Sequence, residues 1–421
     1  MRGFFPLLCP EKSAWGLLFS CYKQLSLACY YLHCLFASVS SSSLFFHESL
    51  LPEQLKGGES FPLPAQKLPV TTRTRQATNT HRMPKIAIIG GGLVGLSTAL
   101  CLSESLPQCS VTIISETFSP NTTGDVAAGC LIPHAYPDTS LQQQKEWFKE
   151  TFDHLLKIAN SPEASTAGIS LLSGWQIYKT SPKEIYPFWS DLVLGFRTMT
   201  DAELAKFPGY SFGQAFTTLK CQSSLYLAWM KKRFQNHGGL VHREKVINVW
   251  DLHGKYDVIV NCSGIGSRNL FDDLSIYPVK GQVLQVHAPW LKHFIRDGDG
   301  STYIYPGISS TTLGGTREKH DWTLSPDAKT SKEIFERCCS LEPSLQGSRV
   351  IEEKVGLRPV RSAIRLEKEI MIKNGHQLPV IHNYGHGGGG FSVHIGTAKT
   401  ASRLVKELLV DLRYIQTKSK L

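Results

Sequence analysis

The sequence lacks the residue clusters that mark metal-binding, disulfide-rich or nucleic-acid-binding proteins. Its 11 cysteines include no CxxC pair and no Cys/His spacing of the kind that holds zinc, and they do not form a disulfide framework. The formal net charge is +10, but the lysines and arginines are scattered, with no basic run and no stripe of alternating basic and aromatic residues. We therefore expect no metal site and no nucleic-acid partner, and the positive charge instead favours small acidic substrates.

A long uninterrupted apolar run is also missing. Residues 27–46 come nearest, but serines and His33 interrupt them, so they do not predict a transmembrane helix, and they lie too far from the first residue for a signal peptide. Residues 61–82, rich in Pro, Thr and Arg, are typical of a linker. We expect residues 1–82 to lie outside the working protein, which would begin at Met83, and we expect no stable membrane insertion; a targeting or anchoring segment is the alternative.

The C-terminus contains a sequence that resembles a targeting signal. Ser419, Lys420 and Leu421 match the peroxisomal import tripeptide, which a receptor reads and which does not anchor a protein to a membrane. The tripeptide predicts a protein of the peroxisomal matrix, with the import receptor as a partner.

The most informative stretch is PKIAIIGGGLVGLSTAL, residues 84–100. Its β-branched apolar run predicts a buried parallel strand, helical spacing follows, and Gly90, Gly92 and Gly95 form a G-x-G-x-x-G motif between the two. Gly90 permits a tight turn, Gly92 lets a pyrophosphate approach the backbone, and Gly95 allows the helix to pack closely on the strand. Because the start of the helix would offer N–H groups to the phosphates, the stretch predicts a dinucleotide site.

Two later segments extend this prediction. Glu116 follows the second predicted strand, residues 110–115, where a carboxylate can accept hydrogen bonds from an adenosine ribose. Residues 256–270 predict another buried strand that enters a glycine-containing turn. A late strand that returns beside the first is frequent in flavin-type folds, so the pattern favours FAD over NAD. The 421 residues are enough for two domains.

The segments TTGDVAAG (122–129) and HNYGHGGGGFSVHIG (382–396) resemble those of the D-amino-acid oxidases, and the resemblance spans residues 84–421. Further shared segments are GWQIY, VLGFR, FGQAFTTLKC, VNCSGIGSR, GQVLQV, YIYPG, TLGGTR and VGLRPVR. Within this family the chain is most similar to the members that oxidise acidic D-amino acids. The resemblance implies an α/β fold in which a Rossmann-type FAD-binding domain holds an inserted mixed-sheet (α+β) substrate domain. The expected FAD-binding segments are 83–164, 241–274 and 376–421, and the expected substrate-binding segments are 165–240 and 275–375.

The resemblance also implies a non-covalent FAD. The expected cofactor-binding residues are Gly90, Gly92, Leu93, Val94, Gly95, Glu116, Thr117, Thr123, Gly124, Cys130, Val246, Gly387, Phe391 and Ser392. Two of them depart from the family pattern, because Gly124 stands where Ser is common and Cys130 stands where a larger apolar residue is usual. The affinity for FAD is the property that these two departures would change.

An amino acid that presents its Cα–H to a flavin needs a fixed carboxylate anchor, which an arginine fork and a tyrosine hydroxyl can supply. By resemblance these groups are Arg358 and Tyr303, and Tyr305 of the same YIYPG segment also contributes to the substrate site. Arg296 and Arg317 occupy positions that distinguish the members acting on acidic substrates. A second substrate carboxylate would pair with these two guanidinium groups, which would otherwise carry an uncompensated desolvation cost.

His386, in YGHGGGG, invites assignment as a general base. If a hydride leaves Cα directly for flavin N5, no protein base is required to remove a proton from Cα. The protein then accelerates the reaction by positioning the substrate. We therefore assign no catalytic base and expect His386 to hold the glycine turn. Gly388 stands where the acidic-substrate members can have Ser, which is a departure towards the neutral-substrate pattern.

Together these features predict an FAD-dependent oxidase. It would convert D-aspartate, and also D-glutamate and N-methyl-D-aspartate, to an imino acid that water hydrolyses to the 2-oxo acid and ammonia, or methylamine in the case of the N-methyl substrate. Dioxygen, the second substrate, would be reduced to hydrogen peroxide. Two alternatives stay open: an oxidase for neutral D-amino acids, and a catalytically silent protein that binds FAD or nothing and docks to a membrane or a partner.

Overall fold

A computed structural model describes residues 82–418, with side chains described up to residue 412, and these residues belong to one compact unit. Residues 1–81 and the tripeptide Ser419-Lys420-Leu421 lie outside the described residues. The predictions of a dispensable extension and of an import signal therefore stay predictions. Within the described range, no helix combines the length and the apolar character needed to cross a membrane.

The strand predicted before the glycines is β1 (Lys85–Gly91), the middle of a parallel group of strands. It lies between β2 (Ser110–Phe118) and β7 (Val258–Asn261), so the late strand does return beside the first. The group is completed by β6 (Leu240–Arg243) beside β2 and by β14 (His376–His386) beside β7. Because helices and strands cover both faces, residues 86–89 of β1 and 258–260 of β7 are continuous apolar runs with buried side chains.

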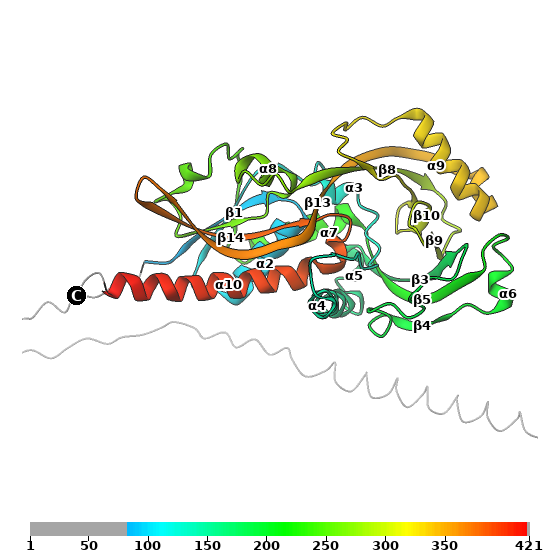
Figure 1. Ribbon diagram of the computed structural model, residues 1–421, viewed down its shortest axis with the longest axis horizontal. Coiled ribbons are helices and arrows are strands. Elements are labelled where there is room, and N and C mark those ends of the chain that lie inside the picture. Colours follow the sequence, from blue (N-terminus) through cyan, green and yellow to red (C-terminus); the bar gives the residue numbers. More distant parts are fainter. Residues whose placement is uncertain (1–81, 419–421) are drawn as a thin grey trace, which may run out of the picture. The chain divides into compact units, whose positions relative to one another are not determined.

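The other strands continue the same 14-stranded sheet in mostly antiparallel pairing (Figure 1). From the far edge inwards they are β4 (Leu194–Thr198), β5 (Phe212–Cys221), β3 (Ile169–Tyr178), β9 (Phe294–Asp297), β10 (Tyr303–Pro306), β11 (Thr311–Gly314) and β8 (Tyr277–His287), with the short β12 (Glu318–Lys319) beside β8. This combination confirms the predicted α/β fold with a mixed sheet.

The long strand β13 (Arg349–Lys373) joins the two groups of strands. Its residues up to Val360 pair with β8, and those from Val360 onward pair with β14 in a long hairpin. The change of partner therefore falls at Val360, whereas the predicted limit between the substrate and FAD-binding domains lies at residues 375 and 376. The domain limits remain a proposal.

Long helices cover the sheet. On the parallel strands α2 (Leu93–Ser105) packs against α10 (Gly390–Lys418), which also contacts α4 (Leu141–Ala159), while α7 (Ser223–Asn236) packs on α2. The helix α9 (Ala328–Leu341) covers β8 and β11. The short helices are α3 (Thr123–Val126), α5 (Ala164–Ala167), α6 (Asp201–Leu204) and α8 (Ser267–Leu270), with 3₁₀ turns η1 (Val249–Leu252), η2 (Gly264–Gly266) and η3 (Pro343–Gly347).

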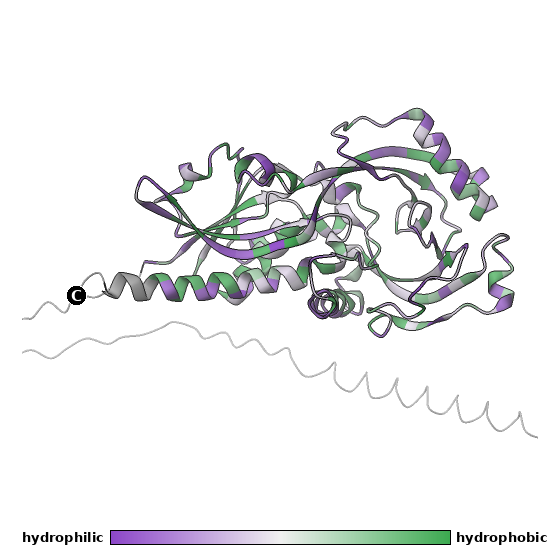
Figure 2. Ribbon diagram, viewed as in Figure 1, coloured by the Kyte–Doolittle hydropathy of each residue, from purple (hydrophilic) through white to green (hydrophobic). Residues whose placement is uncertain are grey.

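The apolar spacing in TASRLVKELLVDL, residues 400–412, predicts a helix with one apolar face, and the structure confirms it. Ala401, Val405, Leu408 and Leu409 of α10 are buried, and Leu404 is half-buried. Figure 2 shows apolar and polar residues alternating along α9 and α10, as expected of helices with one face on a sheet and one in water.

Candidate functional site

The glycine loop forms the junction between β1 and α2, and its glycines are needed for two different reasons. A Cβ on Gly90, whose φ is +115°, would lie 2.4 Å from the carbonyl oxygen of Cys262, and a Cβ on Gly95 would lie 1.9 Å from that of Gly90. These two positions exclude side chains because backbone packs on backbone. A Cβ on Gly92 would meet nothing nearer than Thr122 at 4.0 Å, so this backbone faces open space.

The first turn of α2 offers unfilled hydrogen-bond donors to that space. Gly92 caps the helix without a side-chain hydrogen bond, and the first turn contains no acidic residue. The free N–H groups and the positive end of the dipole of this 13-residue helix suit an anion. The loop therefore fits the pyrophosphate of FAD.

A cavity of about 680 Å³, here called the main cavity, extends from this loop to the antiparallel strands. Most of the predicted site residues line it. From the cofactor set these are Gly90, Gly92, Leu93, Val94, Thr117, Thr123, Gly124, Cys130, Gly387, Phe391 and Ser392, and from the substrate set Arg296, Tyr303, Tyr305, Arg317 and Arg358. The structure thus brings together residues from nearly the whole described chain.

Three predicted cofactor residues are outside this lining. Gly95 lies behind it, against the backbone of Gly90. Glu116 is exposed, and its Oε2 lies 3.1 Å from Nζ of Lys245. The next residue, Val246, packs against the core beside β1 and β2. The contacts expected of Glu116 and Val246 with the adenosine part of FAD remain predictions.

Three arginines from three different elements meet at the opposite end of the main cavity. Arg296 belongs to β9, and its Nη1 donates to Oε1 of Gln176 at 2.8 Å. Arg317 follows β11, and its Nη1 donates to the carbonyl oxygen of Asp299 at 2.9 Å. Arg358 lies in β13, and its Nη1 donates to the carbonyl oxygen of Thr316 at 2.9 Å.

Among the described residues, none of these three guanidinium groups forms an ion pair with a carboxylate. Asp299 is nearby, but its Oδ1 accepts from the backbone N–H of Ser301 at 2.6 Å. Burial, and then the like charges of Arg296 and Arg358, lower the pKa of Arg317. This end of the cavity therefore concentrates three positive charges that form no ion pair within the described part of the chain, and it suits an anionic ligand.

Tyr303 of β10 lines the main cavity together with these arginines. Its ring stacks on that of Tyr305 with centroids 4.7 Å apart. Cβ atoms on Gly314 and Gly315 would lie 2.3 and 2.7 Å from its hydroxyl oxygen, so this pair of glycines makes room for the phenol. Burial raises the pKa of Tyr303, while the charge of Arg358 opposes that rise, so the hydroxyl stays protonated and can donate a hydrogen bond.

The predicted glycine turn after β14 is held from two sides. His386 is buried, with its Nε2 3.0 Å from Oγ1 of Thr397 in α10, and burial lowers its pKa to about 3. Its carbonyl oxygen accepts from the hydroxyl of Tyr136 at 2.8 Å. A neutral imidazole that is already hydrogen-bonded to the neighbouring helix suits the predicted role of holding the turn, and that role stays a prediction.

Sequence reasoning missed the loop that contains Tyr136. In this loop His134 also lines the main cavity, and burial followed by the charges of Arg317, Arg296 and Arg358 lowers its pKa. The signal in the sequence is a polar and an aromatic residue shortly after Cys130, which is too common a pattern to single out. His134 and Tyr136 reach the site only because the folded chain brings this loop against β14.

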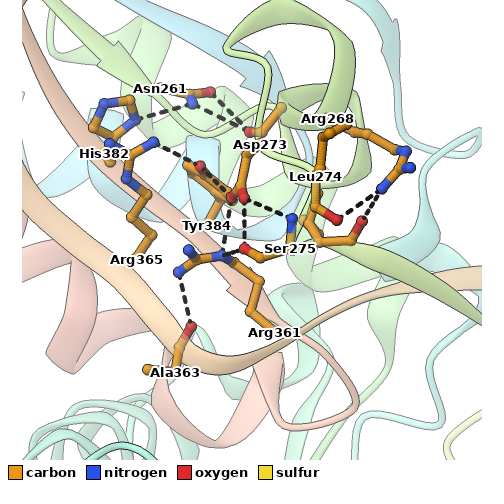
Figure 3. A network of polar contacts seen from close by, with 12 residues as sticks. Asn261, Arg268, Asp273, Leu274, Ser275, Arg361, Ala363, Arg365, His382 and Tyr384 are labelled. Carbon is orange, nitrogen blue, oxygen red and sulfur yellow. Dashed lines mark hydrogen bonds and ion pairs between the residues drawn. The ribbon is translucent and has the colours of Figure 1, made fainter.

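A second feature that the sequence did not reveal is a polar network beneath the end of β14 (Figure 3). The carboxylate of Asp273 accepts from the hydroxyl of Tyr384 at 2.7 Å and pairs with Nε of Arg361 at 2.9 Å. Nη1 of Arg365 donates to the same hydroxyl at 3.1 Å. A Cβ on Gly385 would lie 2.8 Å from Cδ of Arg361, so the network packs directly under the turn that lines the cavity.

Comparisons with known proteins agree with this geometry. Residues 85–404 match the model of the DAO family, described as FAD dependent oxidoreductase. The chain belongs to this family. It is 60% identical over 337 residues to a D-aspartate oxidase of Homo sapiens, covering 80% of this chain and 99% of the relative. It is 35% identical over 335 residues to a D-amino acid oxidase of Dugesia ryukyuensis, covering 78% and 99%.

A solved structure of glycine oxidase from Bacillus cereus ATCC 14579 has the same fold, with a TM-score of 0.64 at 18% identity over 77% of this chain and 95% of that one. The family resemblance, the fold class and the FAD cofactor predicted from the sequence are thereby confirmed. The protein is an FAD-dependent oxidoreductase of the DAO family, and its glycine loop, main cavity and β14 turn are the parts that would hold the cofactor.

Proposed function

We propose that this DAO-family protein oxidises D-aspartate, and also D-glutamate and N-methyl-D-aspartate, with dioxygen as the electron acceptor. The observation that carries the proposal is the meeting of Arg296, Arg317 and Arg358 in one cavity without an ion-paired carboxylate among the described residues. Two carboxylates on one substrate would satisfy these groups. The 60% identity to a D-aspartate oxidase supports the same substrate class.

Arg358 and Tyr303 are proposed to hold the substrate's α-carboxylate. The two Nη1 hydrogen bonds of Arg358 to the carbonyl oxygens of Lys280 and Thr316, at 3.3 and 2.9 Å, fix the guanidinium plane. The Tyr303 hydroxyl, set over Gly314 and Gly315, would donate the second contact. Two fixed donors define both the position and the direction of the carboxylate, and thereby the direction in which Cα–H points.

Arg296 and Arg317 are proposed to take the distal carboxylate. An acidic side chain would neutralise two partly buried charges, whereas an apolar side chain would leave both unpaired. A site built to pair a charged group discriminates strongly against a ligand that lacks this group. Preference for acidic over neutral D-amino acids follows from this pairing.

When bound, FAD would accept a hydride from Cα and pass two electrons to dioxygen, which yields hydrogen peroxide. The protein's own residues position the substrate, and none is assigned to remove the Cα proton. His386 is buried, bonded to Thr397 and neutral, so it is not available as a base. The imino acid formed from D-aspartate would hydrolyse to the 2-oxo acid and ammonia.

One feature favours the second candidate, an oxidase of neutral D-amino acids. Gly388 lines the main cavity, and a Cβ there would lie 3.6 Å from Cδ of Arg358, so the absence of a side chain leaves room beside the carboxylate anchor. The experiment that separates the candidates is peroxide release by the purified, FAD-loaded protein across a panel of D-amino acids. We expect kcat/KM for D-aspartate to exceed that for D-alanine; the reverse order would replace the first candidate by the second.

We also propose a peroxisomal location, which is supported by the tripeptide Ser419-Lys420-Leu421 and by the formation of peroxide. Deletion of the tripeptide should disperse the protein from peroxisomes when the two forms are compared in cells. Unchanged import of the shortened chain would show that the tripeptide is not the address.

A further inference from the structure

The turn between β9 and β10 holds both arginines that are proposed to read the substrate side chain. Nη1 of Arg296 donates to the carbonyl oxygens of Asp297 and Gly298, both at 3.3 Å, in addition to its bond with Gln176. Nη1 of Arg317 donates to the carbonyl oxygen of Asp299. Three successive carbonyls of one turn thus orient two guanidinium groups of like charge, one from β9 and one from the segment that follows β11.

Gly300, the next residue of this turn, lies where the two guanidinium groups approach each other. It is buried, lines the main cavity and has a φ of +68°. A Cβ on Gly300 would lie 2.5 Å from Nη2 of Arg317 and 2.6 Å from Nη2 of Arg296. Both distances are far inside van der Waals contact, so any side chain at this position would displace at least one guanidinium group.

We infer that Gly300 is a specificity-determining residue for acidic substrates, an inference that rests on the proposed function. The absence of a side chain lets Nη2 of Arg296 and Nη2 of Arg317 share one small space. A distal carboxylate entering that space would receive hydrogen bonds from both groups. A methyl group at position 300 would move the donors without removing either charge.

The turn itself would survive such a change. Two backbone hydrogen bonds close it, from N–H of Gly300 to the carbonyl oxygen of Asp297, at 2.8 Å, and from N–H of Asp297 to that of Thr302, at 2.8 Å. Neither involves a side chain, and the atoms that Cβ would meet are the ends of two flexible side chains. The guanidinium groups therefore move more readily than the backbone. The substitution should lower the preference for acidic substrates while the protein still folds.

The left-handed backbone of Gly300 adds a strain to any substitution that is unrelated to the arginines. The chain offers a matched control for this strain in Gly195, which has a φ of +62°, is exposed in β4 and would place its Cβ within 4 Å of nothing. Gly195→Ala carries the backbone cost alone. Gly300→Ala carries a similar backbone cost and the displacement of the guanidinium groups.

The test compares the FAD-loaded full chain with its Gly300→Ala and Gly195→Ala variants. We expect kcat/KM for D-aspartate to fall about 10- to 100-fold in Gly300→Ala, mainly through KM, which corresponds to the loss of one hydrogen bond to a charged group. The fall for D-alanine should be at least several-fold smaller, because D-alanine does not reach this space. Gly195→Ala should change neither value by more than about twofold.

A binding measurement gives a readout that does not depend on turnover. Titration with succinate and with propionate, followed by the flavin absorption spectrum, should show Kd for succinate raised by a similar factor in Gly300→Ala and Kd for propionate much less affected. Equal changes for the two ligands, or no change beyond that of Gly195→Ala, would overturn the inference. A wild-type protein that prefers D-alanine would instead overturn the proposed function, and the titration would still decide whether Gly300 shapes a dicarboxylate site.

Discussion

At the glycine loop the main cavity is lined by backbone, whereas at its opposite end it is lined by guanidinium groups. The loop depends on the absence of side chains, since Gly90 and Gly95 let backbone pack on backbone and Gly92 leaves the start of α2 open. The arginine end consists of long charged side chains: the turn around Gly300 orients Arg296 and Arg317, and Gln176 holds Arg296 as well. The first end is a local structure, and the second is assembled from distant strands.

The two ends of the main cavity therefore tolerate different substitutions. A side chain on Gly90 or Gly95 would collide with backbone atoms that cannot move without separating β1, β7 and α2. A change at the arginine end would disturb flexible side-chain ends, so it would alter substrate choice while the fold persists. Damage to the first end should thus abolish the holoenzyme, and damage to the second should produce an active enzyme with altered specificity.

The largest expected effect is that of Gly95→Val. Its Cβ would fall 1.9 Å from the carbonyl oxygen of Gly90, which would force α2 away from the loop and disrupt the donors for the pyrophosphate. We expect the purified variant to lack the visible absorption of bound flavin. Gly347→Ala is the control, since its Cβ would meet nothing within 4 Å, and a Gly95→Val protein that binds FAD as wild type does would contradict the role of the loop.

A smaller and more selective effect is expected of Arg317→Ala. Loss of one of the two charges that face the distal carboxylate should lower kcat/KM for D-aspartate by about 100-fold, or about 2 to 3 kcal/mol, and affect D-alanine far less. Arg358→Leu is the variant for comparison, because removal of the proposed α-carboxylate anchor should lower kcat/KM for both substrates. Equal losses for the two substrates in Arg317→Ala would show that this residue does not read the side chain.

The smallest expected effect concerns pH and stability. Burial lowers the pKa of His386 to about 3, so below pH 6.5 the unfolded chain binds a proton that the folded protein does not. Stability is thus unaffected by this group above pH 6.5 and falls as the pH drops from 6.5 towards 3. Between pH 6.5 and 5 the His386 contribution should be about 1 to 2 kcal/mol.

The measurement is urea unfolding of the holoprotein over this pH range, for wild type and for His386→Asn. The variant should lose less stability on acidification, because asparagine has no proton to gain. Parallel pH profiles for the two proteins would contradict a buried neutral imidazole at this position. Similar burial lowers the pKa of His394 to about 3, so a residual slope is expected in the variant.

The glycine loop can be predicted from the residues themselves because the motif, the strand before it and the helix after it are contiguous in the chain. The role of the arginines in the substrate site can be predicted only from the family resemblance, since nothing local distinguishes Arg358 from Arg361 or Arg365. In the structure Arg358 faces the main cavity, while Arg361 pairs with Asp273 and Arg365 with Glu369. The difference lies in the strand register, which the sequence around each arginine does not reveal.

The β1–loop–α2 unit, the buried late strand β7 and the apolar face of α10 can be predicted from the amino acids alone, because each depends on contacts between near neighbours or on a simple periodicity. The tertiary structure decided which arginines share a cavity, and that Gly300 leaves room for two of their guanidinium groups. It also decided that Tyr136 and Asp273 support the β14 turn. These arrangements depend on strands that are far apart in the chain and adjacent in the sheet, so only their packing creates them.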